Sequence, residues 1–125
     1  VGATHPNLVR HEGEAYRERL VALAESLGVS AHVEFVNAFL EQDELLDRLQ
    51  AADLYVTPYL NMQQVTSGAL SYAVAVGKAV VSTPYLHAQE ILDDGHGVFV
   101  PARDPAALAK AVGALLSDPA RRAEL

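Results

Sequence analysis

Short apolar runs, several of them rich in β-branched residues, alternate along this chain with segments whose apolar residues recur at helical spacing. The runs predict strands at residues 1–4, 33–36, 54–57, 79–83 and 98–100. The connections between these strands and the intervening helices are short, which is typical of parallel strands joined by helical crossovers. The sequence therefore predicts an α/β fold, in which one open parallel sheet carries helices on both faces.

The helical segments have recognisable start and stop signals. Helices are expected at residues 16–27, 41–51, 90–93 and 105–116, together with a short Ala-rich helix that Gly77 stops. Gly28 can close the first of them in a left-handed cap, and Asp104 followed by Pro105 begins the last. Lys78, directly after Gly77, is expected to be an exposed turn residue.

Both ends of the chain look like the ends of an excised segment. The first four residues match the tail of a buried strand, and Asp118 with Pro119 begins a helix that does not finish. A chain of 125 residues, 50% of them hydrophobic, is long enough for one core. We therefore expect a single domain over residues 1–125 that belongs to a longer protein.

Charge and composition exclude several classes of function. The net charge is −7 and the only adjacent basic pair is Arg121–Arg122, which argues against nucleic-acid binding through a basic patch. The absence of Cys excludes disulfides and thiolate chemistry. No apolar run approaches the roughly 20 residues that cross a bilayer, and no signal peptide opens the chain. These features favour a cytoplasmic protein.

The segment from Gln64 to Thr83 contains the best candidate for a ligand site. It consists of a loop of small and hydroxyl residues, a short Ala-rich helix and a buried strand. A loop that enters a helix at the edge of a parallel sheet leaves backbone N–H groups free at the helix N-terminus, where the helix dipole also favours negative charge. The segment therefore predicts a ligand that carries phosphate.

An ordered series of short motifs then points to a known family. The series consists of residues 52–58, 67–68, 73–82, 90–95, 97–101, 104–109 and 115–119, and it spans nearly the whole chain. It resembles the C-terminal domain of group 1 glycosyltransferases, the large retaining family of GT-B architecture. The order of the motifs carries this resemblance, since no single one of them is diagnostic.

The resemblance implies a two-domain, hexosyltransferase-like enzyme. Its C-terminal, Rossmann-like domain would bind a nucleotide-sugar donor, and an N-terminal domain absent from this chain would bind a glycan or lipid acceptor. No metal or other cofactor is implied, because backbone N–H groups, a helix dipole and basic side chains would meet the phosphate charge. The chain alone is expected to be inactive, and the full-length protein could associate with the inner face of a membrane.

Two positions depart from the pattern of the family. Gln64 and Tyr72, with seven residues between them, stand where the family has its two hallmark Glu residues. The resemblance places Gln64 near the transferred sugar, in a catalytic position, where its amide keeps hydrogen bonding but loses the charge. It places Tyr72 in the region that contacts ribose. The alternative for Tyr72 is plain packing of an aromatic side chain in a short apolar helix.

The resemblance assigns Thr66, Ser67 and Gly68 to the diphosphate of the donor. A glycine there allows close approach of the backbone, and the hydroxyls could add donors. An ordinary Ser/Thr helix cap would need the same residues, so that alternative stays open.

Three further residues are candidates for the donor cleft. His5 and His87 follow predicted strands, and Glu90 matches the Glu of a family segment that continues to Asp94 and Gly95. Solvated histidines and a structural Glu are the plainer interpretations. The five His residues have no metal-ligand spacing, so no metal site is predicted.

Two other functions remain open at this point. One is a non-catalytic relative that binds carbohydrate or nucleotide, which the loss of both hallmark acids favours. The other is a different enzyme on the same type of sheet, such as a sugar epimerase, because fold alone does not decide function.

Overall fold

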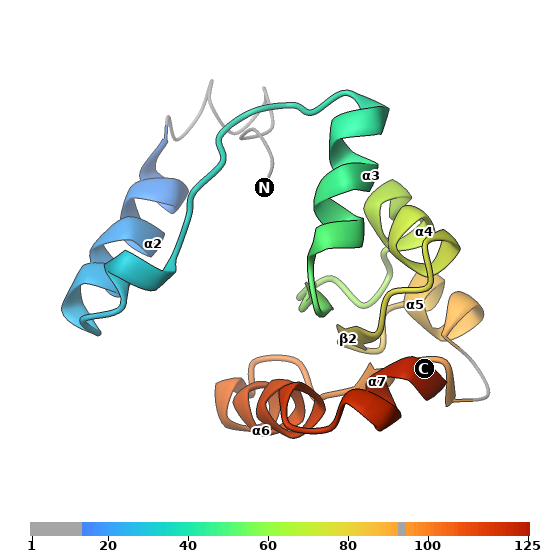
Figure 1. Cartoon of the computed structure of the whole chain (residues 1–125). Helices are drawn as coiled ribbons and strands as arrows, with labels where there is room; N and C mark the ends of the chain where they lie inside the picture. Colours follow the sequence, from blue (N-terminus) through green and yellow to red (C-terminus); the bar gives the residue numbers. More distant parts are fainter. Residues whose placement is uncertain (1–13, 93–94) are drawn as a thin grey trace. The chain divides into compact units, whose positions relative to one another are not determined.

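The computed structural model describes residues 14–92 and 95–125, and the chain divides into two compact units, residues 1–41 and 42–125 (Figure 1). The strand predicted at residues 1–4 and the candidate His5 lie outside the described residues.

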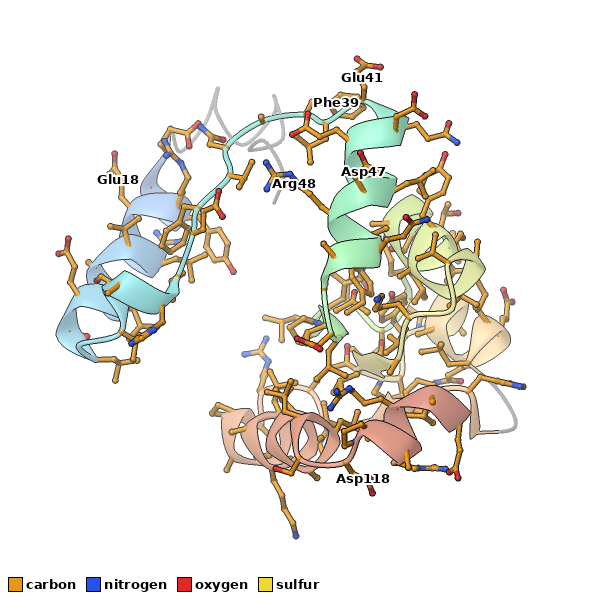
Figure 2. The ribbon with its side chains drawn as sticks, viewed as in Figure 1. Glu18, Phe39, Glu41, Asp47, Arg48 and Asp118 are labelled. Carbon is orange, nitrogen blue, oxygen red and sulfur yellow. The ribbon has the colours of Figure 1, made fainter. Side chains whose placement is uncertain are left out.

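The described part of the first unit, residues 14–41, contains one helix and a short 3-10 turn. Helix α2 spans Ala15–Ser26. Gly28, which follows the C-cap residue Leu27, has a φ of +68°, the left-handed conformation predicted for it. The turn η1 follows at Ser30–His32. Most of the apolar side chains of this unit are exposed, up to 88% at Phe39, which Figure 2 labels before the start of α3.

The predicted strand at residues 33–36 is wrong. These residues take no regular secondary structure, and Val33 and Phe35 are exposed. An apolar run becomes a strand only when a neighbouring strand satisfies its backbone N–H and C=O groups. Within the described residues no strand lies beside this run.

The second unit contains a parallel sheet. Strands β1 (Tyr55–Thr57), β2 (Val80–Ser82) and β3 (Val98–Phe99) are ordered β1-β2-β3, with Tyr55 opposite Val80 and Val81 opposite Val98. All three lie within predicted strands. The α/β class and the parallel sheet are therefore confirmed.

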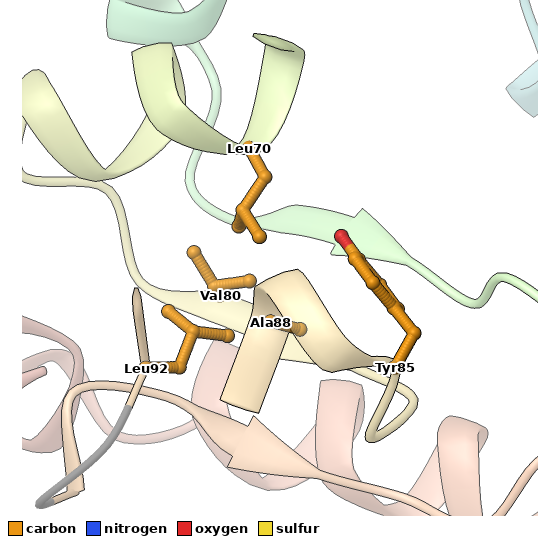
Figure 3. Packing of buried hydrophobic residues seen from close by; sticks show 5 residues of the cluster. All are labelled: Leu70, Val80, Tyr85, Ala88 and Leu92. Atoms are coloured by element: carbon orange, nitrogen blue, oxygen red, sulfur yellow. The ribbon is translucent and has the colours of Figure 1, made fainter. Parts of the chain in front are cut away.

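Helices cover both faces of this sheet. Val80 packs on one face with Leu70 of α4 (Gly68–Ala75) and with Ala88 of α5 (Leu86–Ile91), in the cluster shown in Figure 3. Helix α3 (Gln42–Ala51) contacts α4. Val81, the next residue of β2, packs on the other face with Leu115 of α6 (Pro105–Leu116). This alternation follows from the strand geometry, in which successive side chains point to opposite faces.

Three helix starts are fixed by side-chain caps. Ser67 accepts a hydrogen bond from Leu70 N at the start of α4. Asp104 caps α6, and Asp118 caps α7 (Pro119–Glu124), each through a 2.9 Å bond to a backbone N–H. The helix predicted at 90–93 instead starts at Leu86, so that boundary was wrong.

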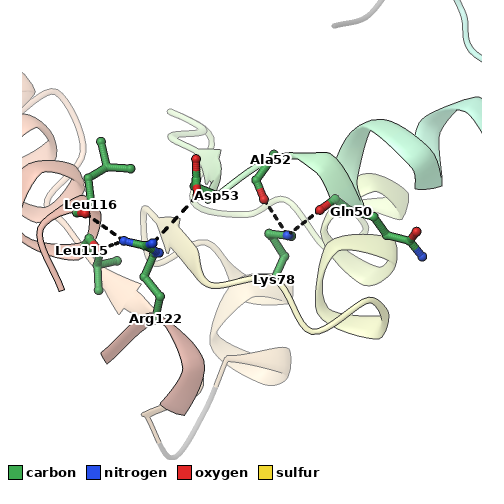
Figure 4. A network of polar contacts seen from close by, with 7 residues as sticks. All are labelled: Gln50, Ala52, Asp53, Lys78, Leu115, Leu116 and Arg122. Carbon is green, nitrogen blue, oxygen red and sulfur yellow. Dashed lines mark hydrogen bonds and ion pairs between the residues drawn. The ribbon is translucent and has the colours of Figure 1, made fainter. Parts of the chain in front are cut away.

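Two cations satisfy carbonyl groups at helix C-termini near the amino ends of β1 and β2 (Figure 4). Lys78 Nζ donates to the carbonyls of Gln50, at 3.1 Å, and Ala52, at 2.5 Å, where α3 ends. Lys78 is therefore half-buried and not the exposed turn residue that was expected. Arg122 Nη1 donates to the last carbonyls of α6, at 2.7 and 2.9 Å, and its Nη2 lies 3.8 Å from Asp53.

Candidate functional site

The carboxyl ends of the parallel strands share one edge of the sheet, where ligands of open α/β sheets bind. At this edge β1 runs into the loop of residues 58–67, which leads to α4, and β2 runs through Thr83 into α5. Two helix N-termini therefore meet the same loop.

Backbone hydrogen bonds tie the loop to the start of α5. Leu86 N donates to Met62 O at 3.0 Å, and His87 N donates to Gln64 O at 3.1 Å. Inside the loop, Gln64 Nε2 donates to Thr66 O at 2.6 Å. The amide group of Gln64 therefore stabilises the loop, which a carboxylate could not do in the same way because it has no donor.

Ser67 is the most constrained residue of the loop. Its side chain is the α4 cap, and its carbonyl accepts from Ser71 N at 3.2 Å and Ser71 Oγ at 3.3 Å. Its own N–H donates to His87 Nδ1 at 2.7 Å. Ser67 is only 5% exposed. It caps α4, and its amide is already paired within the protein.

The next two amides, of Gly68 and Ala69, begin α4. No hydrogen bond to either N–H is found among residues 14–92 and 95–125. Gly68 is exposed, and a Cβ atom placed on it would meet nothing within 4 Å. These two N–H groups, at the positive end of the helix dipole, form the open part of the candidate site.

A cluster of hydroxyl groups lies beneath the loop. Thr57 Oγ1 and Tyr85 Oη are 3.3 Å apart, and the rings of Tyr59 and Tyr85 meet edge to face at 5.0 Å. Burial, with smaller contributions from the neighbouring Tyr59 and Tyr85, raises the pKa of Tyr55 from 10.0 to about 12, against the opposing hydrogen bonds of Thr57 and Ser67. The sequence did not predict this cluster. The available signal was the spacing of Tyr55 and Thr57, two positions apart in β1, and of Thr83 and Tyr85, two positions apart after β2.

The structure brings some of the predicted residues together and leaves others apart. Gln64, Thr66, Ser67 and His87 belong to one connected group, and Thr66 is exposed. His87 lies in the first turn of α5, because this helix starts before the predicted position of residue 90.

Tyr72 and Glu90 lie outside this connected group. Tyr72 is half-buried on α4, and Glu90 is exposed on α5, one turn beyond His87. In the described part of the chain, no hydrogen bond or ion pair joins either residue to the loop.

Among the described residues, no group of three His, Asp or Glu side chains could hold a metal ion. None of the described helices is both long and apolar enough to cross a membrane. A cavity of about 370 Å³ lies at the opposite, amino edge of the sheet, between Lys78 and Arg122. Both cations donate to carbonyl groups at helix C-termini, and the exposed carboxylate of Asp53 lines the same cavity.

Comparisons with known proteins agree with this architecture. A family model described as "Glycosyl transferases group 1" matches residues 8–118. The chain is 38% identical over 112 residues to a D-inositol 3-phosphate glycosyltransferase of Xylanimonas cellulosilytica, covering 89% of this chain and 26% of the relative. It is also 38% identical over 104 residues to the protein of that name in Corynebacterium urealyticum, covering 82% of this chain and 24% of the relative. No solved structure gives a significant match.

The chain thus spans about a quarter of the length of these curated relatives. The family match covers most of the chain, including all three strands of the sheet and the loop at its carboxyl edge. The predicted resemblance is confirmed: this chain belongs to the group 1 glycosyl transferase family.

Proposed function

We propose that this chain is the donor-binding part of a retaining glycosyltransferase, and that it binds the diphosphate of a nucleotide sugar at the N-terminus of α4. The observation that carries the proposal is the pair of amides of Gly68 and Ala69, which open the helix without a partner in the described part of the chain. Membership of the family and the names of the two relatives support sugar transfer as the reaction.

The electrostatics of the loop and helix suit an anion. Residues 58–77 contain no Asp or Glu, although the whole chain has a net charge of −7. The same residues contain no Lys or Arg, so the local attraction comes from N–H groups and the helix dipole. Preorganised donors of this kind would stabilise the negative charge that develops on the leaving nucleotide.

The roles of the remaining residues follow from their positions. Thr66 is exposed beside the open amides and would add a hydroxyl donor. Ser67 would act by fixing the start of α4, and Gln64 by shaping the loop near the transferred sugar. Tyr72 would lie toward the ribose or pack on α4. The acceptor, a glycan, a lipid or another glycoconjugate, would bind to a separate N-terminal domain, and no metal is required.

A second candidate function is a non-catalytic relative that binds a nucleotide or a carbohydrate. It is favoured by Gln64 and Tyr72, which stand where the family has its two acids. The two candidates differ in turnover. An enzyme would release free nucleotide from its donor when an acceptor or water takes the sugar, whereas a binding protein would leave the donor intact.

The test is a calorimetric titration of the full-length protein with UDP, GDP and ADP and with UDP-, GDP- and ADP-sugars. Gly68→Asp places a carboxylate at the open amides, where it also suits the first turn of the helix. We expect it to weaken nucleotide binding by more than about tenfold, and Gly68→Asn, of nearly the same size, to weaken it less. Gly113→Asp, at a helical glycine with equally open surroundings, is the charge-matched control.

Two results would count against the proposal. The first is a wild-type protein that binds none of these nucleotides. The second is Gly68→Asp binding as tightly as Gly113→Asp, which would place the diphosphate elsewhere.

A further inference from the structure

We propose that His87 is a positioning residue of the donor site, which acts through its Nδ1 atom on the amide of Ser67 and so sets the loop that enters α4. This inference rests on the proposed function, because the loop is the one that would meet the diphosphate.

His87 holds both ends of one loop segment. Its backbone N–H donates to Gln64 O at 3.1 Å, and its Nδ1 accepts from Ser67 N at 2.7 Å. A single residue of α5 therefore hydrogen-bonds to both the first and the last residue of segment 64–67. The backbone bond is available to any residue except proline, so only the bond to Ser67 depends on histidine.

The bond to Ser67 also defines the state of the ring. Nδ1 can accept a hydrogen bond only when it carries no proton, so the imidazole is neutral with its proton on Nε2. Without this acceptor, the N–H of a residue that is only 5% exposed would lose its partner. An unpaired buried N–H is costly, and the loop would shift to find water or another acceptor.

Such a shift of the loop would move the two amides that are proposed to bind the ligand. Ser67 caps α4, and Gly68 and Ala69 follow it without a break. Moving Ser67 therefore changes the direction of the two open amides. His87 would control their placement without touching the donor itself.

Three substitutions separate this role from others. His87→Asn puts a carbonyl oxygen close to the position of Nδ1 and removes the Nε2 end of the ring. His87→Gln puts its amide group near the position of Nε2 and leaves Ser67 without its acceptor. His87→Ala removes both ends, and His32→Ala, at an exposed histidine, is the matched control.

The full-length protein and these variants are titrated with UDP, GDP and ADP and with the corresponding nucleotide sugars, and the unfolding midpoint is measured in parallel. We expect His87→Ala and His87→Gln to weaken nucleotide binding by about tenfold, and His87→Asn to stay within about threefold of the wild type. This rescue by Asn is the result that a general loss of stability would not produce. If His87→Ala does not fold, the Asn and Gln variants carry the comparison.

The contrary results are distinct. Wild-type affinity in His87→Ala and His87→Gln overturns the inference and leaves the proposed function standing. Equal loss in Asn and Ala, with Gln retained, shows that Nε2 contacts the ligand and also overturns it. A wild-type protein that binds no nucleotide overturns the proposed function and this inference together.

Discussion

Ser67 shows how one residue can join a strand, two helices and a loop. Its hydroxyl caps α4, its N–H donates to His87 of α5, and its side chain partly opposes the rise in the pKa of Tyr55 of β1. A serine in this position could be predicted as a cap or as a phosphate contact from the sequence. That its amide is paired with a histidine 20 positions away could not, because the pairing depends on how α5 returns to the sheet.

The raised pKa of Tyr55 leads to a testable prediction for a single residue. Its pKa is raised from 10.0 to about 12 mainly by burial, so the folded state holds its proton more tightly than the unfolded state does. The stabilisation is complete below about pH 10 and is lost as the pH rises toward 12. Absorbance at the tyrosinate band should therefore show a late step from Tyr55, which Tyr55→Phe removes.

The control for this titration is Tyr16→Phe, at a tyrosine that is 59% exposed in the first unit. The control should keep the late step. A late step that persists in Tyr55→Phe would assign the raised pKa to the wrong side chain. The free energy of unfolding should also fall less steeply with pH in Tyr55→Phe than in the control.

At the scale of elements, start signals were more reliable than strand signals. Asp104 and Asp118 each cap the helix predicted for them, because a cap is a local arrangement of neighbouring residues. The run at residues 33–36 has the same apolar character as β1 but forms no strand. A strand depends on a partner that lies elsewhere in the chain, which a local pattern does not specify.

Helix α3 provides a prediction at this scale. Lys78 Nζ donates to two carbonyls at its C-terminus, where a cation also interacts favourably with the helix dipole. We expect Lys78→Met to lower the free energy of unfolding by about 1 kcal/mol, as measured by urea denaturation. Lys110→Met, at an exposed lysine of α6, should change it by less than about 0.5 kcal/mol. Equal effects of the two substitutions would contradict the capping role.

At the scale of the whole molecule, the core belongs to one of the two units. Residues 42–125 contain both buried clusters, which pack against the two faces of the sheet, whereas Ala24 is the only buried apolar residue among residues 14–41. Local opening is easiest where few apolar contacts are buried. The two units should therefore differ in stability.

Hydrogen exchange followed by mass spectrometry checks this expectation. The hydrogen-bonded amides of β2 and α4 should be the best protected, and amides of α2 should exchange orders of magnitude faster at the same pH. Equal protection of α2 and α4 would show that the first unit is held by contacts beyond those of its described residues.

The sequence by itself determined the α/β class, the alternation of strands and helices that gives a parallel sheet, and the caps at Asp104 and Asp118, because these depend on the local spacing of residues. It also determined the family, through an ordered series of motifs. The tertiary structure alone decided which apolar runs became strands, that Lys78 closes a helix, and that His87 holds the Ser67 amide at the carboxyl edge of the sheet. Each of these depends on residues far apart in the chain meeting in space. Backbone N–H and C=O groups form hydrogen bonds with whichever groups the fold brings near them, and a local sequence pattern does not predict which groups those are.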